Sequence, residues 1–457
     1  MQEPVVTEAR TTDRELLDFV MRTPRWFFGS TVVFGAILAA GFAVFILLLM
    51  FGLQYFGYSH PVYWSFPIVN LVFWIGISHA GIMVSAILRL SQAEWRRPVT
   101  RAAEVLTIFS LLTAMLMPIV HSGRPWRTLY WEFPYDWIRG AWPNPRSPLV
   151  WDPSAIFTYL LSTLMFVYIA LLPDLALARD KASDPVRRVL FTILAMGFRG
   201  TSRQWRIQAI AGILLSAIIL PIFVSVHSIV SWDFAVTSLP GWHNTVFAPY
   251  FVIGAVHSGV SAVVTVTIVL RKILKLENYI KADHIDSLAR LLIAVAVTWG
   301  FFLFLDFGFG LYGEEPAEVA TWMKRTFEMP WLVLAPIFIF TAFLFPVPMW
   351  LFRNVRRSFK WMFITTVSVN IGMWLERYLL IVPGLERKSD LQFVYGEFTP
   401  SWGEGIIVTA SFALVMLGVL TFAKLLPIIP AADVKEGQIL AEKFAVGKTD
   451  VPAAMRE

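Results

Sequence analysis

Two residues that can exchange protons, His121 and Asp152, flank a polar stretch in an otherwise apolar chain. His121 closes one long apolar segment, and Asp152 opens the next. A neutral imidazole accepts protons near physiological pH, and a carboxylate can take the proton onward or orient the ring. Oxidation of a quinol releases protons together with electrons. The pair therefore suits quinol oxidation, and we expect both residues to be catalytic.

Neighbouring polar residues could complete such a site. Arg124 and Arg127 follow His121 and could hold the Asp152 carboxylate in its ionised form. After the fifth apolar segment come three further candidates for quinol binding or proton transfer, His227, Asp233 and His243. We expect all of them at the membrane face of His121, where the histidines and aspartates would converge.

Helix capping is the alternative explanation for the same residues. Asp152 followed by Pro153 is typical of the residue before a helix and of its first position. His121 with Gly123 is typical of a helix end. Both explanations stay open, and a capping residue can also be the rigid mount of a catalytic carboxylate.

Three ionisable residues inside apolar segments are candidates because charge is costly within a bilayer. They are Asp306, Glu376 and Arg377, each within a few residues of the outer end of its segment. For Arg377 the alternative is a side chain that extends to the membrane surface. Asp174 could join Asp306 and Glu376 in conducting protons.

The elements that must position these residues are membrane-spanning helices. Of the 457 residues, 57% are hydrophobic and only 15% are charged, which excludes an ordinary soluble protein. Because a helix needs about 20 apolar residues to cross the hydrocarbon, we expect an all-α polytopic membrane protein. Its ten spans would cover residues 30–56, 66–90, 102–121, 154–178, 206–228, 248–274, 288–311, 329–352, 361–382 and 403–427.

Basic residues predict the orientation, since Lys and Arg are retained in the cytoplasm. The two tails and the connections on one side carry 29 of the 38 Lys and Arg residues. We expect a cytoplasmic N-terminal segment (1–29), a membrane domain (30–427) and a cytoplasmic tail (428–457), with His121 at the outer face. The charge pattern does not suggest nucleic acid. The chain has no cysteine, so electrons must leave through another subunit or through noncovalent haem.

A short repeat indicates an internal duplication. Residues 75–81 (IGISHAG) and 253–259 (IGAVHSG) share the pattern I-G-x-x-H-x-G. We therefore expect two four-helix bundles, spans two to five (about 66–228) and six to nine (about 248–382), with spans one and ten peripheral. His79 and His257 could form interhelical hydrogen bonds or ligate haem, and the glycines would let helices approach closely.

The outer loop 122–153 is rich in Trp, Pro and Arg. Aromatic residues at that depth form the interfacial belt of a membrane protein. Repeated prolines restrict the backbone, which would also suit an ordered surface on which a peripheral partner docks.

Four motifs, in order along the chain, resemble one family. They are HSGRPW at 121–126, WPNPRSPLVWD at 142–152, SVHSIVSWDFAV at 225–236 and NIGMWLER at 370–377. They are similar to the NrfD and PsrC-like membrane subunits, and most similar to the ActC-type subunits of bacterial alternative complex III. The resemblance spans nearly the whole chain.

This resemblance implies a quinol-oxidising subunit of a respiratory or photosynthetic complex, with menaquinol as the expected substrate. The catalytic residues proposed for the family fall on His121 and Asp152, and a further polar candidate falls on Asp233. The resemblance implies a subunit that is inactive alone and binds no haem, iron–sulfur cluster or metal. Its partners would be a periplasmic iron–sulfur protein, c-type cytochromes and a sister NrfD-like subunit in a bacterial plasma membrane, with protons released outside.

Two other functions stay open. A secondary transporter also uses repeated bundles with buried ionisable residues, but it needs helices broken at the midplane in both halves. Pro118 and Pro221 lie near outer helix ends, and Pro336 has no counterpart in the first half. A purely structural anchor of an electron-transfer assembly predicts no quinone at the outer face.

Overall fold

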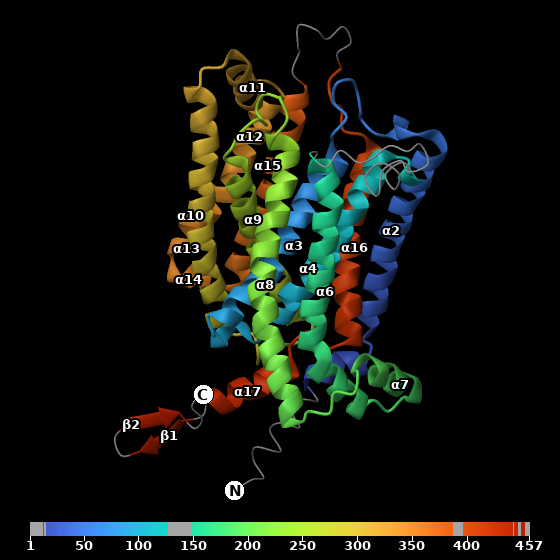
Figure 1. The fold of residues 1–457 in the computed structure, drawn as a ribbon, viewed down its shortest axis with the longest axis vertical. Coiled ribbons are helices and arrows are strands. Elements are labelled where there is room, and N and C mark those ends of the chain that lie inside the picture. Colours follow the sequence, from blue (N-terminus) through green and yellow to red (C-terminus); the bar gives the residue numbers. More distant parts are fainter. Residues whose placement is uncertain are drawn as a thin grey trace.

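The computed structural model describes residues 12, 15–126, 146, 148–386, 396–441, 443–446 and 449–452. Ten long helices run side by side through most of the molecule (Figure 1). They are α2 (Arg25–Phe51), α3 (Phe66–Leu90), α4 (Thr100–Ser122), α6 (Pro148–Lys181), α8 (Ser202–Ala235), α9 (Phe247–Ile273), α10 (Ala282–Tyr312), the interrupted helix from α12 to α13 (Trp331–Leu351), α15 (Phe359–Leu385) and α16 (Trp402–Leu425).

Among the described residues, nine of these helices are long and apolar enough to cross a membrane. The tenth, α15, has the length of a span and carries the polar residues Asn370, Glu376 and Arg377. The all-α polytopic fold expected from the sequence is confirmed. The spans begin and end within about six residues of their expected positions, except that α8 continues seven residues beyond its expected end; α6, α8 and α10 are longer than expected.

Eight of the long helices form two bundles. In bundle one, α3 packs on α4 and α8, and α6 packs on the same two helices. In bundle two, α9 packs on α10 and α15, and the interrupted helix packs on the same two. The remaining helices, α2 and α16, pair with each other outside the bundles, where α16 contacts α4. The expected arrangement of two bundles with two peripheral helices is therefore confirmed.

The repeated glycines lie where α3 and α9 join the two bundles. A Cβ atom on Gly259 would lie 2.3 Å from Cβ of Ala80, and one on Gly76 would lie 3.5 Å from Cα of Ala255. A larger side chain at Gly259 would force the helices apart. Close helix approach, predicted for these glycines, is confirmed.

The eighth span, expected as one helix, is divided by a π-helical turn. The α-helix α12 (Trp331–Ile339) passes into η4 (Phe340–Leu344) and then into α13 (Pro346–Leu351). The carbonyl of Ala342 in this turn accepts a hydrogen bond from Nε2 of His257, at 3.1 Å. The corresponding span of bundle one, α6, is continuous. A secondary transporter built from repeated bundles needs a broken helix at the matching position of both bundles. Here the helix of bundle two is interrupted and its counterpart in bundle one is not, which does not fit that alternative.

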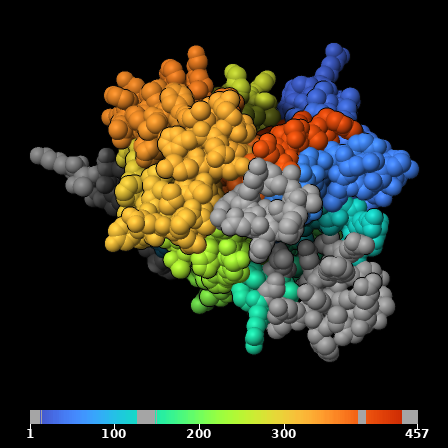
Figure 2. Space-filling model, turned by 90° about the horizontal axis from the view of Figure 1, so that it is seen from above, coloured from blue at the N-terminus to red at the C-terminus, as the bar shows by residue number. Residues whose placement is uncertain are grey.

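Short elements close both ends of the molecule. At the upper end in Figure 1, α11 (Pro316–Phe327) lies over bundle two, which the view onto that face also shows (Figure 2). We call this end the site face. At the opposite end, the basic face, lie η2 (Glu94–Arg96), α7 (Pro185–Leu194), α14 (Arg353–Arg356) and α17 (Ala431–Ala441). A hairpin of β1 (Lys443–Val446) and β2 (Thr449–Pro452) follows α17.

Candidate functional site

A cavity of about 370 Å³ lies among the four helices of bundle one at the site face. Three predicted residues line it: His121 from α4, Asp152 from α6 and Asp233 from α8. The other lining side chains are apolar: Trp64, Ile68, Leu71, Val72, Met115, Pro118, Ile119, Pro125, Pro153, Ile156, Phe157, Val230 and Phe234. The cavity therefore has apolar walls and a small set of groups that can exchange protons, as a site for an apolar ring with polar substituents needs.

The end of α4 fixes the position of His121. Pro118 lies one turn before it inside the helix, and Gly123 ends the helix with φ +60°, a left-handed conformation that glycine adopts readily. A Cβ atom on Gly123 would lie 2.7 Å from the side chain of Leu53 in η1 (Leu53–Tyr55). Glycine at 123 therefore lets the loop after α2 approach the histidine.

That loop supplies a partner that the sequence did not indicate. The hydroxyl of Tyr58 lies 2.8 Å from Nδ1 of His121, and the two rings pack edge to face. The contact holds the ring and leaves Nε2 as the nitrogen for a ligand. Burial raises the pKa of Tyr58 above its ordinary value, so the group stays a neutral phenol.

Glu404, near the start of α16, ties the Tyr58 loop to the bundle. It accepts hydrogen bonds from the backbone N–H of Gly57 at 3.0 Å and from the hydroxyl of Ser65. Ser401, which caps α16, donates to the carbonyl of Tyr55 at 2.7 Å. The side chain of Glu404 is fully buried. Its carboxylate therefore fixes the conformation of the loop that carries Tyr58.

The carboxyl groups of Asp152 and Asp233 both line the cavity and interact with each other. Asp152 is buried, and among the described residues its Oδ1 has no hydrogen-bond partner. Asp233 is half-buried. Two interacting carboxylates in a site with apolar walls repel each other if both are ionised, so the pair is suited to holding one proton between them.

The capping explanation for Asp152 is wrong. Helix α6 begins at Pro148, so Asp152 lies in its second turn and Pro153 lies inside the helix. The helix starts about six residues before the expected position because the apolar residues ahead of Asp152 join it. For His121 the capping explanation and the site coexist, since Gly123 does end α4.

Other predicted neighbours do not reach the cavity. Arg124 is exposed and does not line it, so Arg124 is not the group that faces Asp152. His243 lies in an exposed loop, where Nδ1 contacts the carbonyl of Thr237 at 2.8 Å. Arg127 and most of the outer loop lie outside the described residues. The expected convergence is therefore limited to His121, Asp152 and Asp233.

His227 was expected at the membrane face and lies instead inside bundle one. Its ring packs against His79 of α3 with centroids 4.8 Å apart, and His79 stacks on Tyr159 of α6. The reason is the length of α8, which continues two turns beyond His227 to Ala235. His257 stacks on Trp299 in bundle two. His79 and His257 thus pack in different bundles and do not face a common haem site.

The remaining predicted residues form a separate cluster at the site-face end of bundle two. Tyr250 donates to Glu376, Arg377 pairs with Glu376 at 3.3 Å, and Asn244 donates to Asp306 at 2.7 Å. Arg377 is only 2% exposed, so the alternative that its side chain extends to the membrane surface is wrong. An unpaired charge at bilayer depth costs about 2.5–3.5 kcal/mol. These contacts offset that cost, and none of the three residues lines the His121 cavity.

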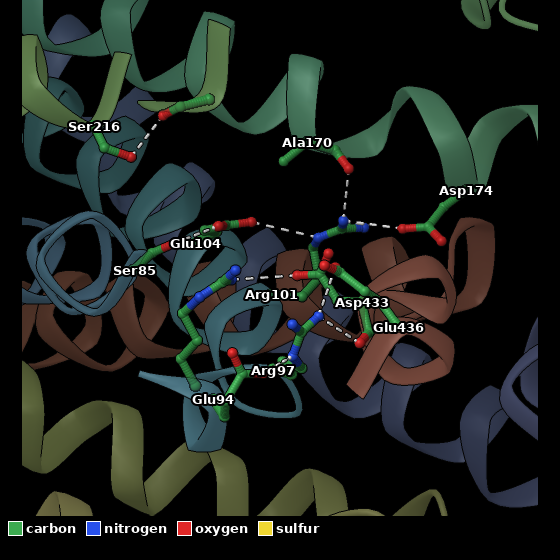
Figure 3. A network of polar contacts seen from close by, with 12 residues as sticks. Ser85, Glu94, Arg97, Arg101, Glu104, Ala170, Asp174, Ser216, Asp433 and Glu436 are labelled. Atoms are coloured by element: carbon green, nitrogen blue, oxygen red, sulfur yellow. Dashed lines mark hydrogen bonds and ion pairs between the residues drawn. The ribbon is translucent and has the colours of Figure 1, made fainter. Parts of the chain in front are cut away.

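A second buried network, near the basic face, centres on Arg101 of α4 (Figure 3). Its guanidinium lies 3.0 Å from Asp174 and 3.4 Å from Glu104. Asp174 also accepts from the backbone N–H of Ala431, where α17 begins. Asp174 therefore belongs to bundle one, whereas Asp306 and Glu376, its expected partners, belong to bundle two. Glu104 was not among the predicted candidates, although a glutamate inside an apolar segment is costly in a bilayer and therefore indicates a buried polar contact.

The fold and the cavity define a class: polytopic helical membrane proteins with proton-exchanging groups gathered at one end of a four-helix bundle. The sequence matches the family of polysulphide reductase, NrfD, over residues 54–387. The chain therefore belongs to the NrfD family.

One curated relative supports this assignment. The chain is similar to a putative membrane subunit of dimethyl sulfoxide reductase from Halobacterium salinarum, at 24% identity over 237 residues. The match covers 52% of this chain and 50% of the relative, so the chain spans about half the length of the curated relative that it matches.

Proposed function

We propose that this chain is the quinol-oxidising membrane subunit of a complex of the alternative complex III type. A quinol ring would bind in the cavity of bundle one, with its hydroxyls toward His121 and the carboxyl pair. The observation that carries the proposal is the meeting of an imidazole and two carboxyl groups in one apolar cavity. A structural anchor has no need of such a cavity.

Quinol oxidation needs a proton acceptor on each side of the ring. For Nε2 of His121 to accept the first proton, Nδ1 must carry hydrogen and donate to the oxygen of Tyr58. The neutral phenol of Tyr58 fits that tautomer as a hydrogen-bond acceptor. The resulting imidazolium would keep the same contact, so the ring need not turn when it becomes charged.

The carboxyl pair supplies the second acceptor. With one proton held between Asp152 and Asp233, the pair carries a single negative charge and can take one more proton. Quinol would then become quinone as one proton goes to His121 and one to the pair. The electrons would leave to the partner proteins, because the chain has no cysteine to hold an iron–sulfur cluster.

The distribution of basic residues supports the direction of proton release. In the part of the chain that the structure describes, most Lys and Arg residues lie toward the face opposite the cavity, as at cytoplasmic faces. The cavity would therefore open toward the periplasm of a bacterial plasma membrane, and protons would leave there. Its partners would be an iron–sulfur protein, c-type cytochromes and a sister NrfD-like subunit, with menaquinol as the substrate.

The test is quinol oxidation by the purified complex carrying His121→Ala. Loss of a general base lowers the rate by roughly 100-fold or more, and we expect that loss in a complex that retains all of its subunits. His243→Ala is the matched control, because its ring is exposed and outside the cavity. Near-normal turnover of the His121→Ala complex would exclude the proposed site. Failure of a quinone analogue to bind even the unmodified complex would favour the structural anchor.

A further inference from the structure

The short helix α7 connects two spans at the basic face and has an apolar surface that the rest of the chain does not cover. Five of its apolar residues are exposed: Val186, Val189, Leu190, Ile193 and Leu194. Their spacing of three and four residues places them on one stripe of the helix. Phe191, outside the stripe, is buried and holds α7 against the bundle.

The position of α7 matches the level at which the membrane begins. Figure 1 shows it beside the lower ends of α6 and α8, projecting sideways from them. The hydroxyl of Tyr168, on α6, donates to the carbonyl of Leu194 at the end of α7. Tyr168 lies in the apolar part of α6, whose neighbouring residues Leu161 and Met165 are exposed as lipid-facing residues are. The end of α7 therefore reaches the depth of lipid-facing residues.

The segment that contains α7 is rich in positive charge. Residues 179–206 contain seven basic and two acidic residues. Within the described part of the chain, Arg199, Arg203 and Arg206 form no ion pair with a carboxylate. Trp205, 40% exposed, lies between them, and tryptophan is enriched where membranes meet water. Phosphate groups of lipids are complementary to this set of side chains.

We propose that α7 lies in the membrane surface, with its stripe among the acyl chains and the nearby arginines bound to anionic phospholipid headgroups. Amphipathic helices with a basic border bind membranes in this way, through buried apolar area and attraction to anionic lipid. The segment between α6 and α8 then fixes the depth of bundle one in the bilayer.

Single cysteines can test the orientation, because the chain has none of its own. Ile193→Cys lies on the stripe, and Thr192→Cys, one residue away, lies on the other side of α7 as the matched control. Both positions are exposed. Each variant of the full chain is spin-labelled in nanodiscs of phosphatidylglycerol and phosphatidylcholine, and also within its native complex.

We expect oxygen to relax the label at position 193 and a water-soluble nickel chelate to relax the label at position 192. Equal access of the chelate to both labels would overturn the proposal. A label at position 193 shielded from oxygen and nickel in the native complex would also overturn it, by placing a protein partner on the stripe.

A second experiment tests the charge. We expect Arg199→Gln combined with Arg203→Gln to lower the preference for phosphatidylglycerol over phosphatidylcholine, measured with spin-labelled lipids, by about five-fold per arginine. Arg290→Gln is the control, since Arg290 is an exposed arginine near the start of α10 and pairs with Asp286 at 2.7 Å. An unchanged preference in the double variant would overturn the role of the arginines.

Discussion

The hydroxyl of Tyr58 lies 2.8 Å from Nδ1 of His121 and joins the loop after the first span to the end of the third. One nitrogen of the imidazole is thereby engaged by the protein, and the other is left for a ligand. The contact makes Tyr58 a positioning residue, since it acts on the proposed substrate only through His121.

Tyr58→Phe removes that hydrogen bond while keeping the ring. A hydrogen bond of this kind contributes about 1 kcal/mol, so we expect quinol oxidation by the complex to slow by roughly five-fold to ten-fold, mainly in kcat. Tyr63→Phe is the control, because Tyr63 is an exposed tyrosine of the same loop whose hydroxyl contacts the nearby His60. Equal losses in the two variants would contradict the positioning role.

The dependence of the quinol oxidation rate on pH can distinguish positioning of His121 by Tyr58 from ionisation of the Tyr58 phenol. Burial raises the pKa of Tyr58 above its ordinary value of about 10, so the neutral form persists as the pH rises toward that value. We expect the unmodified complex and the Tyr58→Phe complex to have parallel rate profiles between about pH 8 and 10. An alkaline inflection found only in the unmodified complex would show that Tyr58 does ionise there.

The carboxyl pair can be tested by a double-mutant cycle. Asp152→Asn and Asp233→Asn should each slow quinol oxidation by roughly 100-fold. If the two residues act as one proton acceptor, the double variant should be little slower than either single one, because effects within a unit are not additive. Asp306→Asn, in bundle two, should be additive with Asp152→Asn. Additive losses for Asp152 and Asp233 would show that the two residues act independently and would contradict the single proton acceptor.

Gly259→Ala tests the contact between the bundles. Its new Cβ atom would lie 2.3 Å from Cβ of Ala80, so α3 and α9 must shift. Overpacking of this kind costs about 1–3 kcal/mol, and we expect a lower midpoint of thermal unfolding in detergent. Gly405→Ala should leave the midpoint unchanged, since a Cβ atom there meets nothing within 4 Å. A similar shift in both variants would contradict the close approach.

The sequence predicted the spans because apolar length is a local property of each segment. It also predicted that His121, Asp152 and Asp233 lie together at one end of the helices, since each is a polar residue near the end of such a segment. The prediction was wrong for His227 because α8 runs past its apolar part to Ala235, which buries the histidine. Hydropathy does not predict the end of a helix when packing against its neighbours determines that end.

Tyr58 and Glu404 could not be predicted from the sequence. Tyr58 contacts a residue 63 positions away, and Glu404 holds a loop 347 positions before it. Neither contact follows from a helical period or a motif, because both depend on how α2, α4 and α16 come together. The site is therefore completed by contacts between residues far apart in the sequence, which local patterns do not predict.

The attachment of Glu404 to Gly57 and Ser65 also orders events during synthesis. The loop of Tyr58 leaves the ribosome early, but the carboxylate that fixes it belongs to the last span. His121 therefore lacks its ordered partner until that span has entered the membrane. A chain interrupted before α16 would carry every proposed proton acceptor but would lack the carboxylate that fixes the loop of Tyr58.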